Sequence, residues 1–98
     1  MNLDEYRNEI DAIDSEIIAL LSRRAEASKN IGLIKAKAGL PIIDRVREVE
    51  IQRRIEQKNN GKLEESALAR IYGEILLESR RIQQETIANL KVEVEVWK

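Results

Sequence analysis

Cysteine and histidine are both absent from the sequence. Without them there can be no disulfide, thiol nucleophile, imidazole base or ordinary zinc site, so we expect neither a metal nor another cofactor. Long apolar runs are absent too, because none approaches the roughly 18 residues that a membrane-spanning helix needs. The first residues, MNLDEYRNEI, lack the basic and then apolar order of a signal peptide. We therefore expect a cytoplasmic protein that does not enter a membrane.

An excess of one charge is also missing. The 98 residues include 17 basic and 18 acidic side chains, which argues against a protein that binds nucleic acid through bulk charge. The apolar share of 43% and the charged share of 36% are typical of one small folded domain rich in helix.

Only four glycines and one proline interrupt the chain. Gly39 and Pro41 form one break, and the segment KNNGK at 58–62 forms another. These breaks predict an all-α chain of three helices, near residues 4–38, 44–58 and 63–90. Asp44 is placed to cap the start of the second helix, because its side chain can accept a backbone hydrogen bond there.

The last eight residues, KVEVEVWK, alternate apolar and charged side chains as a β-strand does. A lone strand, however, finds no partner elsewhere in this chain. Residues 1–90 are therefore predicted to form one helical domain, and residues 91–98 a tail without an assigned structure.

The very long first helix carries an apolar stripe with a period of seven residues. Its members are Leu3, Ile10, Ile17 and Ile31, with Tyr6, Ile13, Leu20, Ala27 and Ile34 three positions later. A helix of some 35 residues is about 52 Å long, which exceeds the width of a compact domain of this size. Because two shorter helices cannot cover such a stripe, we expect a second copy of the chain to cover it, in an intertwined helical-bundle homodimer.

Arg24 interrupts this stripe at a position where the period requires an apolar side chain. Lys35 lies about three turns away on nearly the same side of the helix. The stem of Arg24 could cover the apolar stripe, or a buried polar residue could fix the register of two helices. Arg24 and Lys35 could instead line a polar cavity.

The third predicted helix has a polar gap in its own apolar stripe. Ser79 and Gln83, one turn apart, occupy positions that face inward. They could bond to each other or to water, but together with Arg24 and Lys35 they favour a ligand cavity between helices. Separate cations recognise carboxylates or phosphates, and the sequence has no glycine-rich phosphate loop, so we expect a dicarboxylate ligand.

The order of these residues along the chain resembles that of the all-helical, type II chorismate mutase family. The matching segments are EYRNEIDAID with Arg7, LLSRRAE with Arg24, NIGLIKAKAG with Lys35, PIIDRVRE with Asp44, Arg47 and Glu48, and ESRRIQQ with Ser79 and Gln83. The resemblance covers residues 3–90, and the combined pattern is specific although each piece alone is weak. Arg80 and Arg81 add charge beside Ser79, beyond the family pattern.

The resemblance implies the conversion of chorismate to prephenate, a Claisen-type rearrangement on the way to phenylalanine and tyrosine. An ether C–O bond breaks as a C–C bond forms within one molecule, so no proton transfer or covalent intermediate is required. Catalysis then depends on holding the reactive conformer and on stabilising charge that grows on the ether oxygen. By this resemblance the catalytic residues are Lys35 and Gln83, which would donate to the ether oxygen, and Glu48, which would hold the ring hydroxyl.

The resemblance also implies which residues bind the substrate, namely Arg7, Arg24, Asp44, Arg47 and Ser79. Arg24 and Arg7 would clamp the two carboxylates of chorismate, with Arg7 reaching in from the other protomer. Arg47 would add positive charge nearby, and Ser79 would help with a carboxylate. The region of Asp44 would contact the ring hydroxyl.

Two other functions fit parts of the same pattern. A lyase of the same helical fold, which removes pyruvate from isochorismate, would share the arginines and the lysine. A helical dimerisation or binding module without activity would not need Arg24, Lys35 and Gln83 on inward-facing stripes. The complete D-x-x-R-E segment from Asp44 to Glu48 favours the mutase.

Overall fold

The computed structural model describes residues 1–96, with side chains described as far as residue 92. It contains three helices: α1 (Leu3–Ala38), α2 (Arg45–Lys58) and α3 (Glu65–Val96). No strand occurs within residues 1–96, so the predicted all-α fold class is confirmed. None of the helices in this part of the chain is long and apolar enough to cross a membrane.

The C-terminal end of α3 lies beyond the predicted one. The sequence placed that end near residue 90, whereas the helix continues to Val96 and takes in most of the alternating tail. An established helix gains one hydrogen bond for each residue it adds, and residues 1–96 offer the tail no second strand. Helix propagation therefore outweighs the strand preference of the valines. The last two residues of the tail lie outside the described part.

Backbone and side-chain bonds set both ends of the turn between α1 and α2. Gly39 ends α1 in the left-handed conformation, with φ of 68°, which glycine adopts at little steric cost. The N–H groups of Gly39 and Leu40 both donate to Lys35 O, which closes the helix. At the start of α2, the Asp44 side chain accepts the Arg47 N–H at 3.0 Å, as the sequence predicted for this cap.

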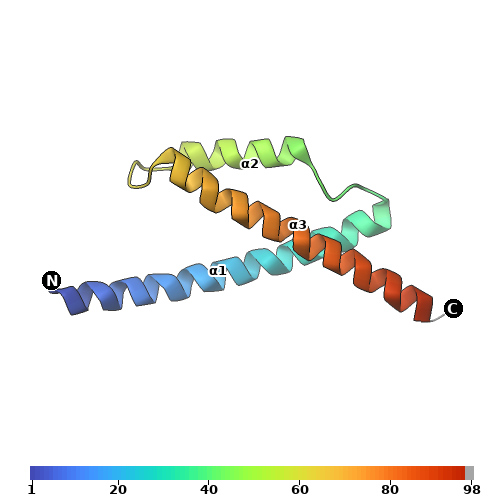
Figure 1. The fold of residues 1–98 in the computed structure, drawn as a ribbon, viewed down its shortest axis with the longest axis horizontal. Helices are drawn as coiled ribbons and strands as arrows, with labels where there is room; N and C mark the ends of the chain where they lie inside the picture. Colours follow the sequence, from blue (N-terminus) through green and yellow to red (C-terminus); the bar gives the residue numbers. More distant parts are fainter. Residues whose placement is uncertain (97–98) are drawn as a thin grey trace.

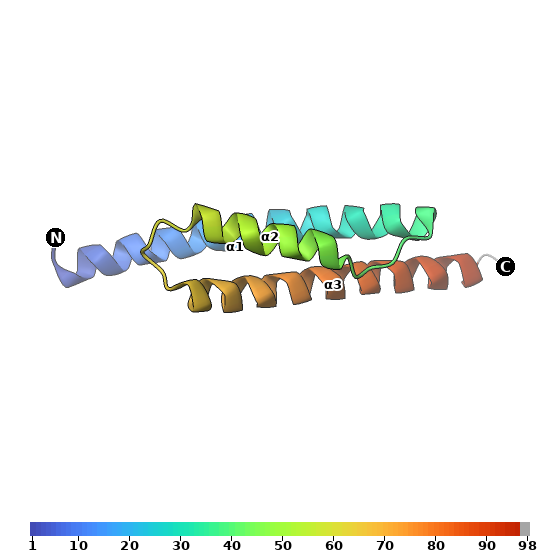
Figure 2. The same cartoon turned by 90° about the horizontal axis from the view of Figure 1, so that it is seen from above.

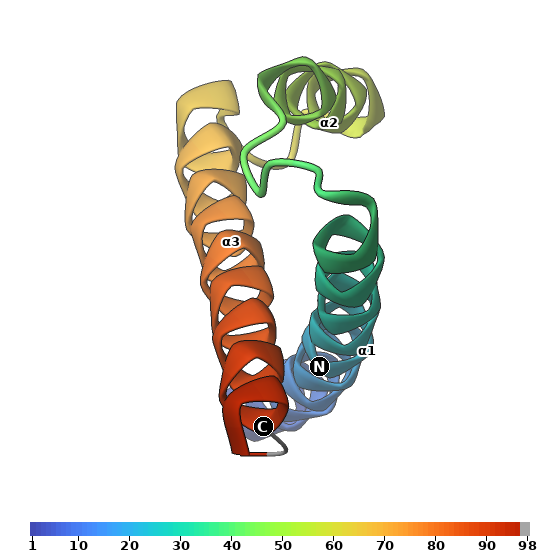
Figure 3. The ribbon, with the colours of Figure 1, turned by 90° about the vertical axis from the view of Figure 1, so that its right-hand side faces the viewer.

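α3 packs against both other helices. It crosses α1 near the C-terminal end of α1, so the N-terminal half of α1 extends away from the rest of the chain (Figure 1). α2 runs beside the N-terminal half of α3 (Figure 2). Seen along the long axis, α2 and the N-terminus of α1 lie on opposite sides of the molecule (Figure 3). The C-terminal half of α1, the start of α2 and the middle of α3 lie around one cavity.

A single chain buries little of its apolar surface. Among the described side chains Leu76 is the one apolar residue that is buried, whereas Ile10, Ile17 and Ile31 of the predicted stripe are 55%, 47% and 44% exposed. The chain measures 63 × 29 × 15 Å and has a radius of gyration of 17.6 Å, against about 13 Å for a compact domain of 100 residues. α1 thus presents an uncovered apolar face over most of its length.

Candidate active site

A cavity of about 370 Å³ lies between the three helices. Its walls come from the C-terminal half of α1, the loop before α2, the start of α2 and the middle of α3. Seven of the eight predicted site residues line it, namely Arg24, Lys35, Asp44, Arg47, Glu48, Ser79 and Gln83. A volume of this size is typical of sites for small molecules.

Arg24 and Ser79 join α1 to α3 at one wall of this cavity. Arg24 Nη1 donates a hydrogen bond to Ser79 Oγ, and Ser79 Oγ donates to Ile75 O at 3.1 Å within α3. The bond to Ser79 uses one of the five N–H groups of the guanidinium, so a ligand carboxylate can accept from the others. Arg24 therefore lines the cavity, one of the arrangements that the stripe left open.

Lys35 lies in the last turn of α1 and is half-buried. Its Nζ donates to Ile42 O at 2.6 Å, which ties the loop before α2 to α1. An ammonium group has three N–H donors, so two of them can still point at a ligand. The loop thus holds the Lys35 side chain at the cavity wall without using up its donors.

Gln83 reaches the cavity from α3 and is only 7% exposed. Its Oε1 atom is buried and has no hydrogen-bond partner among the described residues. Leaving a buried polar atom without a partner costs about 1–3 kcal/mol, so a polar ligand that bonds to this amide removes that cost. Because the amide can turn end for end, it can offer a ligand either its oxygen or its N–H groups.

Gly32 allows α1 and α3 to approach closely beside Gln83. A Cβ at position 32 would lie 3.1 Å from Gln83 Cα and 3.4 Å from both Gln83 O and Thr86 Cβ. Backbone atoms cannot turn aside as a flexible side chain can, so a larger residue would push the helices apart. Gly32 therefore sets the separation between Gln83 and the end of α1 that carries Lys35.

The first turn of α2 brings Arg47 and Glu48 to the cavity. Arg47 is exposed, and its Nη1 lies 3.4 Å from Glu50 Oε2. Glu48 is half-buried, and both of its carboxylate oxygens accept hydrogen bonds from Arg80 of α3. The bond to Glu48 raises the pKa of Arg80, whereas desolvation alone would lower it. This ion pair links α2 to α3 at the edge of the site.

The charges around the cavity favour a doubly negative ligand. Its lining holds four cations and two carboxylates, which are Arg24, Lys35, Arg47 and Arg80 with Asp44 and Glu48. The resulting excess of two positive charges matches the two carboxylates of a dicarboxylate. Partial removal from water strengthens such attractions relative to those at an open surface.

Arg7 stands apart from the other predicted site residues. It is exposed near the start of α1 and does not line the cavity. It precedes Arg24 by 17 residues, a distance of about 25 Å along a helix. Within one chain Arg7 is therefore too far away to contact a ligand that Arg24 binds.

Three residues that shape the cavity were not among the predicted site residues. Ser28 is buried and lines the cavity, and the seven-residue period that it shares with Lys35 was the signal that could have found it. Arg80 was noticed only as additional charge, because its partner Glu48 is 32 positions away on another helix. Gly32 has no side chain, and its importance follows from where two helices cross.

Comparisons with known proteins find a family and relatives that match most of the chain. The family model for chorismate mutase type II matches residues 6–84. A bifunctional chorismate mutase/prephenate dehydratase of Aquifex aeolicus is 47% identical over 78 residues, which are 76% of this chain and 22% of that protein. The intracellular chorismate mutase of Mycobacterium tuberculosis is 43% identical over 61 residues, which are 61% of this chain and 58% of that protein. The chain thus spans about a fifth of the length of the Aquifex relative.

A solved structure supports the same assignment. Chorismate mutase from Helicobacter pylori, in complex with prephenate, superposes with a TM-score of 0.80 and 36% sequence identity, over 88% of this chain and 93% of that one. The three-helix arrangement is therefore shared along nearly the whole of both chains. The match over residues 6–84 confirms the family that the motifs predicted. The chain belongs to the chorismate mutase type II family.

Proposed function

We propose that the protein converts chorismate to prephenate in the cytoplasm, as a step toward phenylalanine and tyrosine. The observation that carries this proposal is the cavity that Arg24 and Lys35 of α1 line together with Gln83 of α3, whose amide oxygen is buried without a partner among the described residues. The positive excess around them suits the two carboxylates of chorismate. The Helicobacter chorismate mutase binds prephenate, which supports the proposed product. The mycobacterial relative is an intracellular chorismate mutase, which supports the proposed location.

The chemistry of this reaction suits a site that has cations and neutral donors. The ether C–O bond of chorismate breaks while a new C–C bond forms within the same molecule, so atoms and electrons balance without any co-reactant. The substrate must be held in a compact conformer, and negative charge grows on the ether oxygen in the transition state. Hydrogen-bond donors that interact with this oxygen more strongly in the transition state than in the bound substrate lower the barrier. Donors that bind both equally would only tighten substrate binding.

We assign the roles as follows. Lys35 and Gln83 donate hydrogen bonds to the ether oxygen. Arg24, with help from Ser79, binds one carboxylate. The remaining residues of the proposed site in this chain act at the start of α2, where Arg47 adds positive charge and Asp44 and Glu48 meet the ring hydroxyl.

We further propose that the active form is an intertwined homodimer in which Arg7 completes the site of the partner chain. The uncovered apolar face of α1 supports a dimer, because a second copy carries a matching stripe that can bury it. The distance of Arg7 from the cavity of its own chain supports a shared site. Sedimentation at micromolar concentration should give the mass of two chains. A stable, fully helical monomer would contradict this part of the proposal.

A direct assay tests the reaction. Purified protein should consume chorismate, followed by the loss of its absorbance, and should form an equal amount of prephenate. Release of pyruvate from isochorismate would favour the lyase instead. If neither activity appears while circular dichroism shows intact helices, the proposed reaction is wrong and a binding module is the better explanation.

A mixing experiment tests the shared site. Arg7→Ala and Lys35→Ala should each be inactive as pure dimers, since every site then lacks one residue. In a refolded equimolar mixture about half of the dimers combine one chain of each kind, and each such dimer holds one complete site. Activity should therefore recover to about a quarter of the wild-type value. No recovery in a mixture that demonstrably exchanges chains would mean that Arg7 does not act across the dimer.

A further inference from the structure

The ion pair between Arg80 and Glu48 differs from the other ion pairs of the described residues. It is the one among them that joins two helices, since the rest lie within a single helix three or four positions apart. Arg80 Nε donates to Glu48 Oε2 at 2.8 Å, and Arg80 Nη2 donates to Glu48 Oε1 at 2.5 Å. The guanidinium therefore grips the carboxylate at both oxygens, a geometry that fixes its orientation.

This pair stands in the wall between two spaces. Arg80 and Glu48 line the cavity of about 370 Å³, and both also line an adjoining groove of about 500 Å³ between α2 and α3. A carboxylate has about four lone-pair positions, of which Arg80 occupies two. Glu48 can thus remain bound to Arg80 and still accept a hydrogen bond from a group inside the cavity.

The carboxylate of Glu48 would weaken the binding of a dianion if its side chain were free to move within the cavity. Glu48 shares the cavity with Arg24, Lys35 and Arg47, the cations that must stay available for the ligand. A Glu48 side chain without Arg80 would be drawn toward them, because opposite charges attract strongly in a partly enclosed site. The cavity would also lose one of its two excess positive charges.

We infer that Arg80 is a positioning residue for the reaction: it holds Glu48 at the cavity wall, oriented toward the substrate hydroxyl and kept from the cations that bind the substrate carboxylates. This inference rests on the proposed conversion of chorismate. Arg80 acts through Glu48 and does not itself contact the substrate. Its loss should therefore raise KM more than it lowers kcat, since a misplaced Glu48 competes with the substrate for the same cations.

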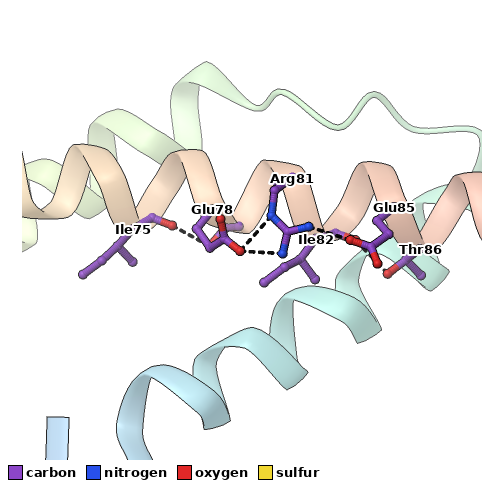
Figure 4. Close-up of polar contacts among 7 residues, drawn as sticks. Ile75, Glu78, Arg81, Ile82, Glu85 and Thr86 are labelled. Carbon is purple, nitrogen blue, oxygen red and sulfur yellow. Dashed lines mark hydrogen bonds and ion pairs between the residues drawn. The ribbon is translucent and has the colours of Figure 1, made fainter. Parts of the chain in front are cut away.

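Arg81, the next residue of α3, provides a matched control. It also makes a two-bonded pair, with Glu78 at 2.8 and 2.6 Å, and a further bond to Glu85 at 2.5 Å (Figure 4). These contacts raise the pKa of Arg81, as the pair with Glu48 does for Arg80. However, Arg81 is 57% exposed, against 30% for Arg80, and does not line the cavity. The two arginines thus have the same charge, lie on the same helix and both pair with glutamates, but the partners of Arg81 lie on its own helix and only Arg80 lines the cavity.

A double-mutant cycle tests the inference. We would measure kcat and KM for chorismate in the wild type, Arg80→Gln, Glu48→Gln, the double variant and Arg81→Gln. Arg80→Gln should lower kcat/KM by roughly 10- to 100-fold, chiefly through KM, whereas Arg81→Gln should stay within about twofold. In the Glu48→Gln background, Arg80→Gln should have a much smaller effect, because there is no carboxylate left to hold and the double variant keeps the wild-type excess of two positive charges around the cavity.

The kinetics of these variants distinguish a failure of the inference from a failure of the proposed function. An Arg80→Gln effect equal to that of Arg81→Gln, or an equally large effect with and without Glu48, would overturn the inference. A wild-type protein without mutase activity would instead refute the proposed function. If circular dichroism shows that Arg80→Gln is unfolded, Arg80→Lys takes its place in the cycle, since it keeps the charge but cannot grip both oxygens. The KM of Arg80→Lys should lie well above the wild-type value. This increase should become much smaller when Glu48 is also replaced by glutamine.

Discussion

Replacing Gly32 by alanine should have two opposing effects on stability. It should stabilise α1 as a helix, and it should destabilise the packing of α1 against α3 beside the site. Glycine inside a helix is about 1 kcal/mol less favourable than alanine, so the substitution stabilises α1 by itself. The new methyl group, however, would lie 3.1 Å from Gln83 Cα, inside the shortest favourable carbon–carbon separation of about 3.5 Å. The helices must then part by roughly 0.4 Å where they cross.

The two effects can be compared in magnitude. Overpacking of this kind typically costs about 1–3 kcal/mol, so after the helical gain we expect a net loss of about 0–2 kcal/mol per chain. The effect on catalysis should be clearer. Misplacing a reacting group by about 1 Å can cost about 100-fold in rate, so a shift of roughly 0.4 Å between Lys35 and Gln83 should lower kcat by about five- to tenfold.

Gly73→Ala is the matched control for this experiment. Gly73 also lies inside a helix, but a Cβ there would meet no atom within 4 Å in the described chain. It should keep wild-type kcat and gain up to about 1 kcal/mol in stability. Thermal unfolding and steady-state kinetics of both variants provide the measurement. Equal stabilisation and unchanged kcat in Gly32→Ala would refute the argument that this glycine sets the spacing of the site.

Three other substitutions give further expected results. Lys35→Ala should lower kcat by about 100- to 1,000-fold while circular dichroism shows intact helices; more than about a tenth of wild-type turnover would exclude Lys35 as a transition-state donor. Gln83→Glu should be nearly inactive at neutral pH, because a carboxylate repels the charge on the ether oxygen, and should recover activity in acid as the carboxyl gains a proton; a flat pH profile would contradict this. Asp44→Ala should lower the free energy of unfolding by about 1 kcal/mol through loss of the helix cap, which denaturation can check.

Much of the fold follows from local patterns in the sequence. The seven-residue period and the break at Gly39 predict α1 closely, and the short side chain of Asp44 predicts its cap because an N-cap involves only neighbouring residues. The end of α3 was less predictable, since alternation in a short segment suits a strand and yet does not prevent an existing helix from continuing. The strand preference of a short segment has little influence when the residues before it are already helical.

In the candidate site, too, local sequence patterns predict some residues, whereas others depend on contacts between helices. The order of the motifs predicted seven of the residues that line the cavity. The roles of Gly32 and Arg80 depend instead on contacts between helices, where the partners Gln83 and Glu48 lie far away along the chain. No pattern within one helix indicates where another helix crosses it. Contacts of this kind become visible only when the helices are placed in space.

The turn between Gly39 and Asp44 also brings two helix ends of opposite polarity to one place. Aligned peptide dipoles give the end of α1 a partial negative charge and the start of α2 a partial positive charge. The first favours the ammonium group of Lys35 in the last turn of α1, and the second favours a carboxylate that approaches α2. These charges belong to the backbone, so no side-chain substitution removes them. A protein stripped of its cavity cations would keep both partial charges, but because their signs are opposite and Asp44 already caps the start of α2, they would offer an anion little net attraction.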